Sequence, residues 1–487
     1  MAEQTVERDT NEQGGLQKSL KMRHMTMISL GGVIGAGLFI ASGPVINGVG
    51  PAAILTYAFT GILLVLVMRM LGEMAVARPS VGSFSDYSRT ALGDWAGFAI
   101  GWLYWYFWVI VVGIEAIAGA GIVAQYLPGV PTWAIALALI VLLTLTNLYS
   151  VRSYGEFEFW FASLKVVAIV LFIVVGFLFI FGAWPASLAE SPGLVNLYGD
   201  GGFAPGGVAT IFASIATAIF AFVGAEVVSI AAAESDEPER AVARATNQVI
   251  YRVLLFYVLS LFLVAAIVPW NTTFAVGTPE NPGIVQSPFA VALENMGIAV
   301  APTLMNIVVL SAVLSVLNSA LYISSRMLFA LARHGDAPQG VTGTTSRGVP
   351  AKAILLGTVI GYVAVLMAYF FPNTVFLFLL NSSGAVALFV YLLIAVSELR
   401  MRARLEREEP ERLQVRMWLY PYLTYLSIFC ILGVFVLMFF NPDLRTQLLL
   451  TLLSVGVVLL AYVLRSRFGG RRTPSRTEET ASGEPAR

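Results

Sequence analysis

Charged residues are scarce in this chain. Only 12% of its 487 residues are Asp, Glu, Lys or Arg, whereas 58% are hydrophobic. Soluble domains carry about 25% charged residues, so this composition excludes a soluble globular protein. Apolar stretches of about 20 residues recur along nearly the whole length, and each is long enough to cross a bilayer as a helix. The composition therefore predicts an all-α polytopic membrane protein.

Cysteine and histidine are nearly absent as well. The single Cys430 excludes an internal disulfide framework and a cysteine-based metal site. His24 and His334 lie beside basic loop residues, which argues against a histidine metal site within the membrane. We therefore expect no metal and no cofactor. The first residues lack an apolar core, so no cleaved signal peptide is expected.

Long polar segments are missing too. No loop is long enough for a soluble catalytic domain, and no nucleophile–base pair is visible at membrane depth, so we do not expect an enzyme or a nucleic-acid partner. The apolar runs predict twelve spans, with ends uncertain by several residues. Their approximate bounds are 25–47, 52–77, 95–126, 132–150, 158–182, 207–233, 248–269, 299–331, 353–371, 374–397, 418–440 and 444–464.

Positive charge gathers in every second loop. Arg78 and Arg89 lie in the second predicted loop and Arg333 in the eighth, while the odd-numbered loops hold almost no basic residue apart from Arg445. By the positive-inside rule, this alternation predicts that both termini are cytoplasmic and that the chain is a multi-pass protein of the plasma membrane. Residues 1–22 then form a cytoplasmic tail, residues 23–466 the transmembrane domain, and residues 467–487 a disordered cytoplasmic tail. A short amphipathic outer helix is expected over 288–298.

Glycine interrupts the first span. Gly31, Gly32, Gly35 and Gly37 fall within seven residues, and each weakens a helix by up to about 1 kcal/mol relative to alanine. Lipid offers no partner to freed backbone groups, so a break at this depth is expected only where it is buried or lines a cavity. The alternative interpretation is close helix packing through the pair Gly31 and Gly35.

A second break is predicted in the sixth span, where Gly224 lies close to Glu226. Five helices separate the two positions, and an odd repeat length inverts the second copy relative to the first. Such inverted repeats with discontinuous helices are typical of secondary transporters. The predicted repeats cover about 25–182 and 207–397, followed by two further helices over 418–464. Half-helix N-termini favour an anion and unwound carbonyls a cation, so a zwitterion fits both.

Three of the ionisable residues within the predicted spans are functional candidates, because charge in a membrane is costly and often functional. Lys165 lies about seven residues into its predicted helix; it either snorkels to the interface or loses its proton when desolvated and couples transport to protons. Glu226 is either a structural ion-pair partner or a group that binds a proton or substrate. Glu115 is either a buried hydrogen-bonded carboxyl or a functional group. The aromatic run Trp102–Trp108 is interpreted as packing and interface anchoring.

Several motifs resemble a known family. Gly32–Phe39, Phe222–Glu226, Tyr154–Trp160 and Asn318–Leu328 are similar to motifs of the amino acid/polyamine/organocation transporters, and within them of the bacterial amino-acid permeases. The resemblance covers about residues 20–465. Three further stretches resemble the 4-aminobutyrate (GABA) permeases most closely; these are Ile230–Asp236, Arg333–Pro338 and Arg416–Pro421.

The resemblance implies a substrate site at the two breaks. The substrate carboxylate would meet backbone N–H groups at Ala36 and Gly37, and the ammonium would meet carbonyls near Val33, Phe220 and Val223. Phe220 aligns with a position that is aromatic and gate-like in relatives. Glu115 is counted with these substrate-binding residues.

The resemblance also implies proton coupling. Lys165 falls where some relatives place a lysine at the position of a sodium ion, and Glu226 aligns with a proton-linked glutamate in antiporter relatives. We therefore expect a symporter that imports protons with a small zwitterionic amino acid, GABA first. A broader permease, one for proline, β-alanine, aromatic or basic amino acids, and an uncoupled exchanger stay open. The oligomeric state is left open.

Overall fold

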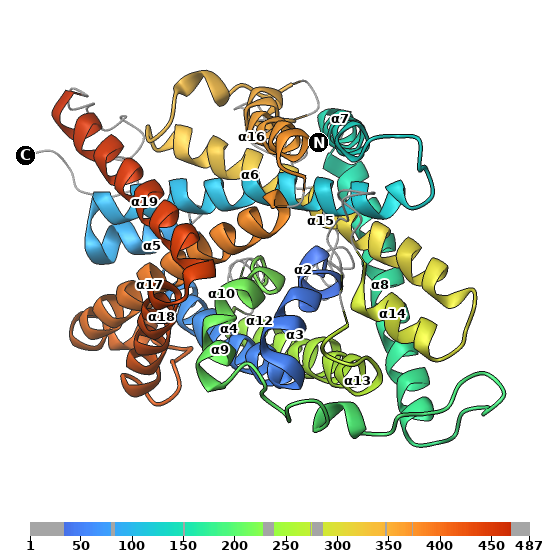
Figure 1. Ribbon diagram of the computed structural model, residues 1–487. Coiled ribbons are helices and arrows are strands. Elements are labelled where there is room, and N and C mark those ends of the chain that lie inside the picture. The colour runs from blue at the N-terminus through green and yellow to red at the C-terminus, as the bar shows by residue number, and fades with distance from the viewer. Residues whose placement is uncertain are drawn as a thin grey trace, which may run out of the picture.

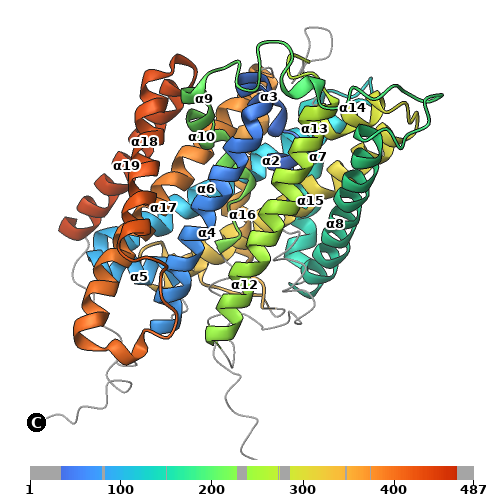
Figure 2. The same ribbon diagram turned by 90° about the horizontal axis from the view of Figure 1, so that it is seen from below.

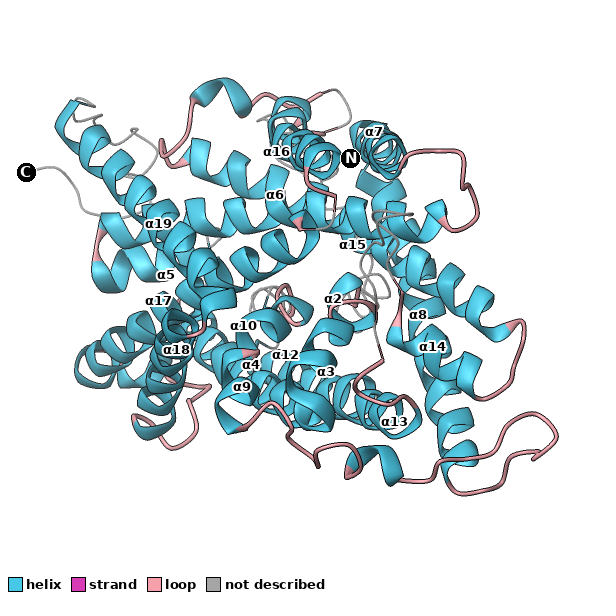
Figure 3. Cartoon of the chain, viewed as in Figure 1, coloured by secondary structure: helices cyan, strands magenta, loops and turns pink. Residues whose placement is uncertain are grey.

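The protein is described here by a computed structural model covering residues 34–78, 83–149, 151–226, 238–272, 274, 286–345, 348–372 and 374–468. Figure 3 shows that helices and connecting loops make up this part of the chain, without a strand. The predicted all-α fold is confirmed.

The helices of the first half of the chain differ widely in length. The bounds are α2 Ala36–Phe39, α3 Ser42–Val49, α4 Ala53–Ala77, α5 Ser83–Leu92, α6 Asp94–Ala124, α7 Thr132–Tyr149, α8 Val151–Ile180, α9 Val208–Ala213 and α10 Ile215–Ala218. Two short 3₁₀ turns cover Gly50–Ala52, where the chain passes from the predicted first span to the second, and Ile219–Ala221 in the predicted sixth span.

The second half begins with a helix that changes type. A π-helical stretch, Val253–Leu259, joins α12 to α13. The bounds are α12 Pro238–Arg252, α13 Ser260–Ile267, α14 Pro288–Asn295, α15 Ala301–Arg333, α16 Ala351–Phe370, α17 Val375–Glu408, α18 Tyr422–Phe440 and α19 Pro442–Phe468.

Ten stretches of the described chain are long and apolar enough to cross a membrane. The first, Ala36–Ala77, has 42 residues, and as one straight helix it would measure roughly 63 Å, about twice the hydrocarbon thickness. The chain reverses at Gly50, whose φ of 80° suits glycine, so that α3 and α4 meet at one end of the molecule (Figure 2). With these counted as two spans, and with the shorter apolar stretch Val208–Ala221, the helices are consistent with the twelve predicted spans.

Burial separates a central helix from peripheral ones. In the most apolar 18-residue window of α6, 89% is buried inside the bundle, whereas in that of Pro442–Arg467 only 11% is buried. Figure 1 accordingly shows α6 crossing the middle of the bundle and α19 along its edge. Apolar side chains on the outer helices, such as Leu453 and Phe440, are exposed as lipid contact requires.

The loops predicted to carry positive charge lie together at one end. Asp336, which follows α15, is buried between Arg89 of α5, at 2.5 Å, and Arg465 of α19. Arg78 pairs with Glu409 at 3.2 Å, so the loops after α4 and α17 also meet. Figure 2 shows α5 and the start of α12 at this same end. These contacts place the second, eighth and tenth predicted loops and the end of α19 together, while the full alternation and its assignment to the cytoplasm stay predictions.

Several predicted boundaries differ from the structure. Helix α5 lies in a segment that we predicted as a loop, and α8 begins at Val151, seven residues before the predicted span. The predicted outer helix over 288–298 is α14. The two tails lie almost wholly outside the described residues, and the proposed division into two repeats stays a prediction.

Candidate functional site

The first break lies in the middle of the bundle. Helix α2 begins at Ala36, after Gly35 in an extended conformation with φ −142° and ψ −142°, and it ends four residues later. A Cβ on Gly35 would lie 2.8 Å from Oε1 of Glu115 and 2.7 Å from a methyl of Val316. Glycine at this position therefore lets helices α6 and α15 approach the broken segment. Gly31, Gly32 and Val33 lie outside the described residues.

Glu115 caps the start of α2. The backbone N–H of Ala36 donates to both carboxylate oxygens of Glu115, at 3.3 and 3.2 Å, and the glutamate side chain is buried. Because the first N–H groups of a helix lack partners within it, an anion is stabilised there. The N–H of Ala36 thus faces a carboxylate of the protein itself, and its contact with a substrate carboxylate stays a prediction.

The second break is in contact with the first. The 3₁₀ turn Ile219–Ala221 ends α10, and Gly224 follows with a φ of 104°, which other residues rarely adopt. A Cβ on Gly37 would lie 2.5 Å from the Cα of Ala221. The backbones of the two predicted breaks therefore touch, and they form one region as expected.

A tyrosine satisfies a freed carbonyl at each break. The hydroxyl of Tyr57 in α4 donates to the carbonyl of Gly37 at 3.1 Å, and that of Tyr257 donates to the carbonyl of Ala221 at 2.7 Å. Each tyrosine comes from the predicted span that follows the broken one. This matched arrangement is what an inverted repeat would produce.

A small cavity lies between the breaks and α6. It measures about 10 Å³, which is room for about one water molecule. Four of its lining residues, Gly37, Glu115, Phe220 and Val223, are predicted site residues, and the others are Phe107, Trp108, Val111 and Val316. The structure therefore brings four of the six predicted substrate-binding residues together around one small cavity, and their role in binding stays a prediction.

The aromatic run in α6 has two roles. Trp102 and Trp105 pack edge to face with ring centroids 5.3 Å apart, in a cluster away from the breaks. Phe107 and Trp108 line the cavity, and Phe107 faces Phe220 at 6.2 Å. These last two residues also pack in the buried core, with ring centroids 5.5 Å apart, so the packing interpretation holds for them, and a role toward substrate stays a prediction.

Lys165 lies deep inside the bundle. It is 14 residues after the start of α8, which places it roughly 21 Å along the helix, and its side chain is fully buried. Its Nζ donates to the hydroxyl of Ser315 at 2.7 Å, and its charge interacts with those of Glu158 and Glu115. The alternative in which Lys165 snorkels to the interface is wrong, because its side chain is fully buried and its Nζ is hydrogen-bonded to Ser315 inside the bundle.

Glu158 is a buried acid that the sequence reasoning missed. Its carboxylate accepts hydrogen bonds from Ser315, at 2.7 and 2.8 Å, and from Ser319 at 3.3 Å. The signal was its spacing, since residues seven apart lie on one face of a helix, two turns from each other. Because the predicted span began at residue 158, Glu158 was assigned to a helix end.

Glu226 belongs to a separate polar group. Its carboxylate accepts hydrogen bonds from the hydroxyls of Tyr104 and Tyr391, each at 3.0 Å, and from the N–H of Gly224 at 2.9 Å. Arg252, also buried, acts on it electrostatically. Glu226 thus anchors the second break, and no hydrogen bond seen in the described residues joins it to Lys165.

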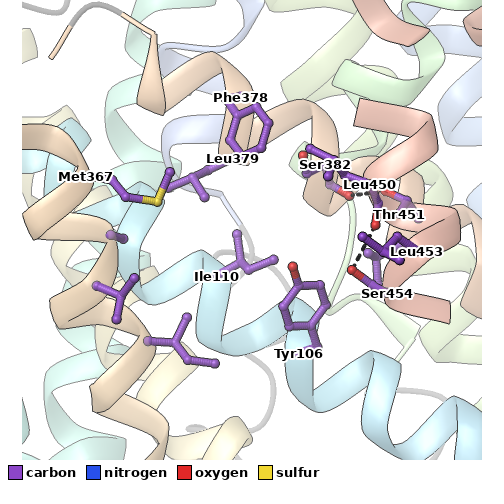
Figure 4. Close-up of a pocket in the computed structure, with 14 residues that line it drawn as sticks. Tyr106, Ile110, Met367, Phe378, Leu379, Ser382, Leu450, Thr451, Leu453 and Ser454 are labelled. Atoms are coloured by element: carbon purple, nitrogen blue, oxygen red, sulfur yellow. Dashed lines mark hydrogen bonds between the residues drawn. The ribbon is translucent and has the colours of Figure 1, made fainter. Parts of the chain in front are cut away.

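A larger cavity of about 260 Å³ lies elsewhere, between α6, α16, α17 and α19 (Figure 4). Its lining is mostly apolar, with the polar groups of Tyr106, Ser382, Thr451 and Ser454. It shares no lining residue with the small cavity at the breaks. It is therefore not part of the predicted site.

A helical membrane bundle with two touching broken helices and buried ionisable groups beside them has the architecture of a secondary transporter. The fold agrees with this class. Two crystal structures of a manganese transporter from Eremococcus coleocola, both of mutant forms, align with TM-scores of 0.55 and 0.53 at 13% identity. Each alignment covers 92% of this chain and 94% of the other.

The chain belongs to the amino acid permease family, whose model matches residues 24–473. It is 52% identical to the gamma-aminobutyric acid permease of Bacillus subtilis, over 93% of this chain and 94% of the relative. It is 48% identical to a probable GABA permease of Pseudomonas aeruginosa, over 97% and 96%. It is 47% identical to the gamma-aminobutyric acid permease of Escherichia coli, over 92% and 93%.

Proposed function

We propose that this protein imports a small zwitterionic amino acid, GABA first, by proton-coupled symport and alternating access across the plasma membrane. The GABA permeases at 47–52% identity support the substrate. The observation that carries the proposal is the N–H of Ala36, which faces a buried carboxylate whose charge interacts with that of the buried Lys165.

The substrate would bind at the two breaks through its charged ends. Its carboxylate would accept hydrogen bonds from the N–H groups of Ala36 and Gly37, which open the half-helix α2. Its ammonium would lie against the carbonyls of Val33, Phe220 and Val223. The cavity lined by Phe220, Val223 and Glu115 supports this assignment, because it adjoins both breaks.

Lys165 is the proposed carrier of the coupling proton. In the apolar interior an ammonium needs partners, and the hydroxyl of Ser315 together with two nearby carboxylates supplies them. Loss of the proton would remove that charge and change the balance between conformations. Glu226 is the second proton-binding candidate, since its protonation would weaken the hydrogen bonds from Tyr104 and Tyr391 that anchor the second break.

Uptake into proteoliposomes tests the function. With a more acidic outside and no sodium, labelled GABA should accumulate above its external concentration, and a protonophore should abolish this accumulation. Uptake that ignores the protonophore but requires internal amino acid would instead identify an uncoupled exchanger.

The Lys165→Met variant tests the coupling residue. It should lose gradient-driven accumulation by at least ten-fold, because methionine keeps much of the side-chain volume but carries no proton. Lys352→Met, at an exposed position near the start of α16, is the matched control and should behave as wild type. A Lys165→Met protein with unchanged pH dependence would exclude Lys165 from coupling.

A thermal-shift panel tests substrate choice. A ligand at a hundred times its dissociation constant stabilises the folded state by about 2.7 kcal/mol, so GABA should raise the melting temperature more than proline, aromatic or basic amino acids. β-Alanine tests the tolerated chain length. A larger shift with another class of amino acid would move the proposal to a broader permease.

A further inference from the structure

We propose that Glu158 accepts the transported proton from Lys165 through the hydroxyl of Ser315 and releases it on the cytoplasmic side. The inference rests on the proposed symport function and extends it to the exit of the proton. It assigns a role to a buried carboxylate that the substrate site does not use.

A continuous hydrogen-bonded chain links the three side chains. Ser315 Oγ accepts from Lys165 Nζ at 2.7 Å and lies 2.7 and 2.8 Å from the two oxygens of Glu158. A hydroxyl has one proton to donate and two lone pairs. Since an ammonium can only donate and a carboxylate only accept, the direction of both bonds is fixed. All three side chains are fully buried, so water does not interrupt the chain.

The charged groups around Lys165 favour the uptake of one more proton. Among the described residues, Glu158 and Glu115 act electrostatically on Lys165, and Lys165 acts on Glu158. Helix α15, packed against α8, contributes hydroxyls from Ser315 and Ser319 rather than charge. One ammonium between two carboxylates carries a net charge of −1 when all are ionised, and a buried net charge favours proton uptake.

The transfer step balances without a co-reactant. An N–H bond of the Lys165 ammonium breaks as its proton moves to Ser315 Oγ, and the Ser315 hydroxyl proton forms a new O–H bond on Glu158. Lysine becomes a neutral amine, glutamate a carboxylic acid, and serine keeps one proton. Because both charges of the Lys165–Glu158 pair disappear together, the transfer separates no charge in the apolar interior.

The position of Glu158 gives the relay a direction. It lies seven residues before Lys165, about 10 Å nearer to the start of α8 at Val151. That end of the helix follows the fourth loop, which is predicted to be cytoplasmic. Lys165 is therefore on the substrate side of the chain of hydrogen bonds, and Glu158 is on the exit side.

Exchange and net uptake separate the relay from a structural role. Counterflow of labelled external GABA against unlabelled internal GABA needs no net release of protons, whereas accumulation driven by a pH gradient does. Glu158→Gln keeps the hydrogen-bond acceptor but cannot take a proton. It should lose gradient-driven uptake by at least ten-fold while counterflow stays within two-fold of wild type.

Ser315→Ala provides an independent variant that breaks the link and leaves both ionisable groups in place. It should show the same split between net uptake and counterflow. Ser311→Ala is the matched control, because this hydroxyl on the same helix donates to the carbonyl of Val308 at 2.7 Å. The control should resemble wild type in both measurements.

The relay is wrong if both Glu158→Gln and Ser315→Ala accumulate GABA as wild type does, or if both lose counterflow in proportion to net uptake. Failure of the wild-type protein to respond to the pH gradient would overturn the proposed function and the relay with it. A responsive wild type with equally responsive variants would overturn the relay alone.

Discussion

At both breaks, single side chains supply hydrogen-bond partners to backbone groups that the interrupted helix leaves without one. Tyr57 and Tyr257 each donate to a freed carbonyl, and Glu115 accepts from the freed N–H of Ala36. In lipid such groups have no other partner, so these side chains are a condition for breaking a helix at this depth. Removal of any one of these side chains should therefore lower both the stability of the protein and its transport activity.

Glu115 offers the clearest residue-level test. Glu115→Ala leaves the N–H of Ala36 without its acceptor, and an unsatisfied buried group destabilises by about 1–3 kcal/mol. Glu115→Gln keeps an oxygen that can accept this hydrogen bond and should be distinctly milder. The measurement is the melting temperature of both purified variants without substrate; an equal loss in the two would show that the cap is not what Glu115 contributes.

The residues at the breaks could be predicted from the sequence, whereas Glu158 could not. Glycine in an apolar helix is a local signal that located the breaks, and the family resemblance then implied Ala36, Gly37, Phe220 and Val223. The importance of Glu158 depends on hydroxyls 157 and 161 positions away in the chain. No local pattern carries such a contact, and only packing of α8 on α15 reveals it.

At the level of elements, α10 is held close to α17 by a glycine. A Cβ on Gly384 would overlap the carbonyl oxygen of Ala216, and α10 leads directly into the 3₁₀ turn that carries Phe220. A small change in this packing therefore moves one wall of the proposed substrate site.

Gly384→Ala should destabilise the protein by about 1–3 kcal/mol through overpacking and should weaken GABA binding. Gly433→Ala in α18 is the matched control, since nothing lies near its Cβ, and alanine there should be neutral or slightly stabilising. Melting temperature and GABA-induced thermal shift measure both effects. Equal behaviour of the two variants would contradict the proposed close packing.

Apolar length predicted the spans well because the bilayer sets it, but it did not predict where helices end. Helix α8 starts within the polar segment before Glu158, and α17 continues to Glu408, beyond the predicted end at 397. Backbone hydrogen bonds continue past the hydrocarbon boundary, where hydropathy gives no signal. Helix α5 is ten residues long and polar on average, so no apolar run indicated it.

At the level of the whole molecule, the basic loops gather at one end, and the positive-inside rule predicts that this end faces the cytoplasm. The pairs Arg89–Asp336 and Arg78–Glu409 connect these loops. The structure by itself contains no membrane, so labelling in cells is the direct test.

Single cysteines in a Cys430→Ser background measure the orientation. Gly129 and Gly343 are exposed, lie in loops at opposite predicted faces, and have open space at the Cβ position. A membrane-impermeant thiol reagent should label Gly129→Cys in intact cells and Gly343→Cys only after permeabilisation. The reverse pattern would show that the topology is the opposite of the predicted one. Labelling of both variants in intact cells would show that the reagent enters the cells.

The contact between Glu115 and Ala36 has a consequence for the transport cycle. A substrate carboxylate that uses the N–H of Ala36 competes with a tethered ligand already at hand, whose effective concentration is in the millimolar range or above. The apparent affinity for the substrate then reflects the difference between the binding free energies of the substrate carboxylate and of the Glu115 carboxylate. It does not report the binding free energy of the substrate alone. The same tether keeps the half-helix neutralised when the carrier returns without substrate, a step that the proposed symport requires in every cycle.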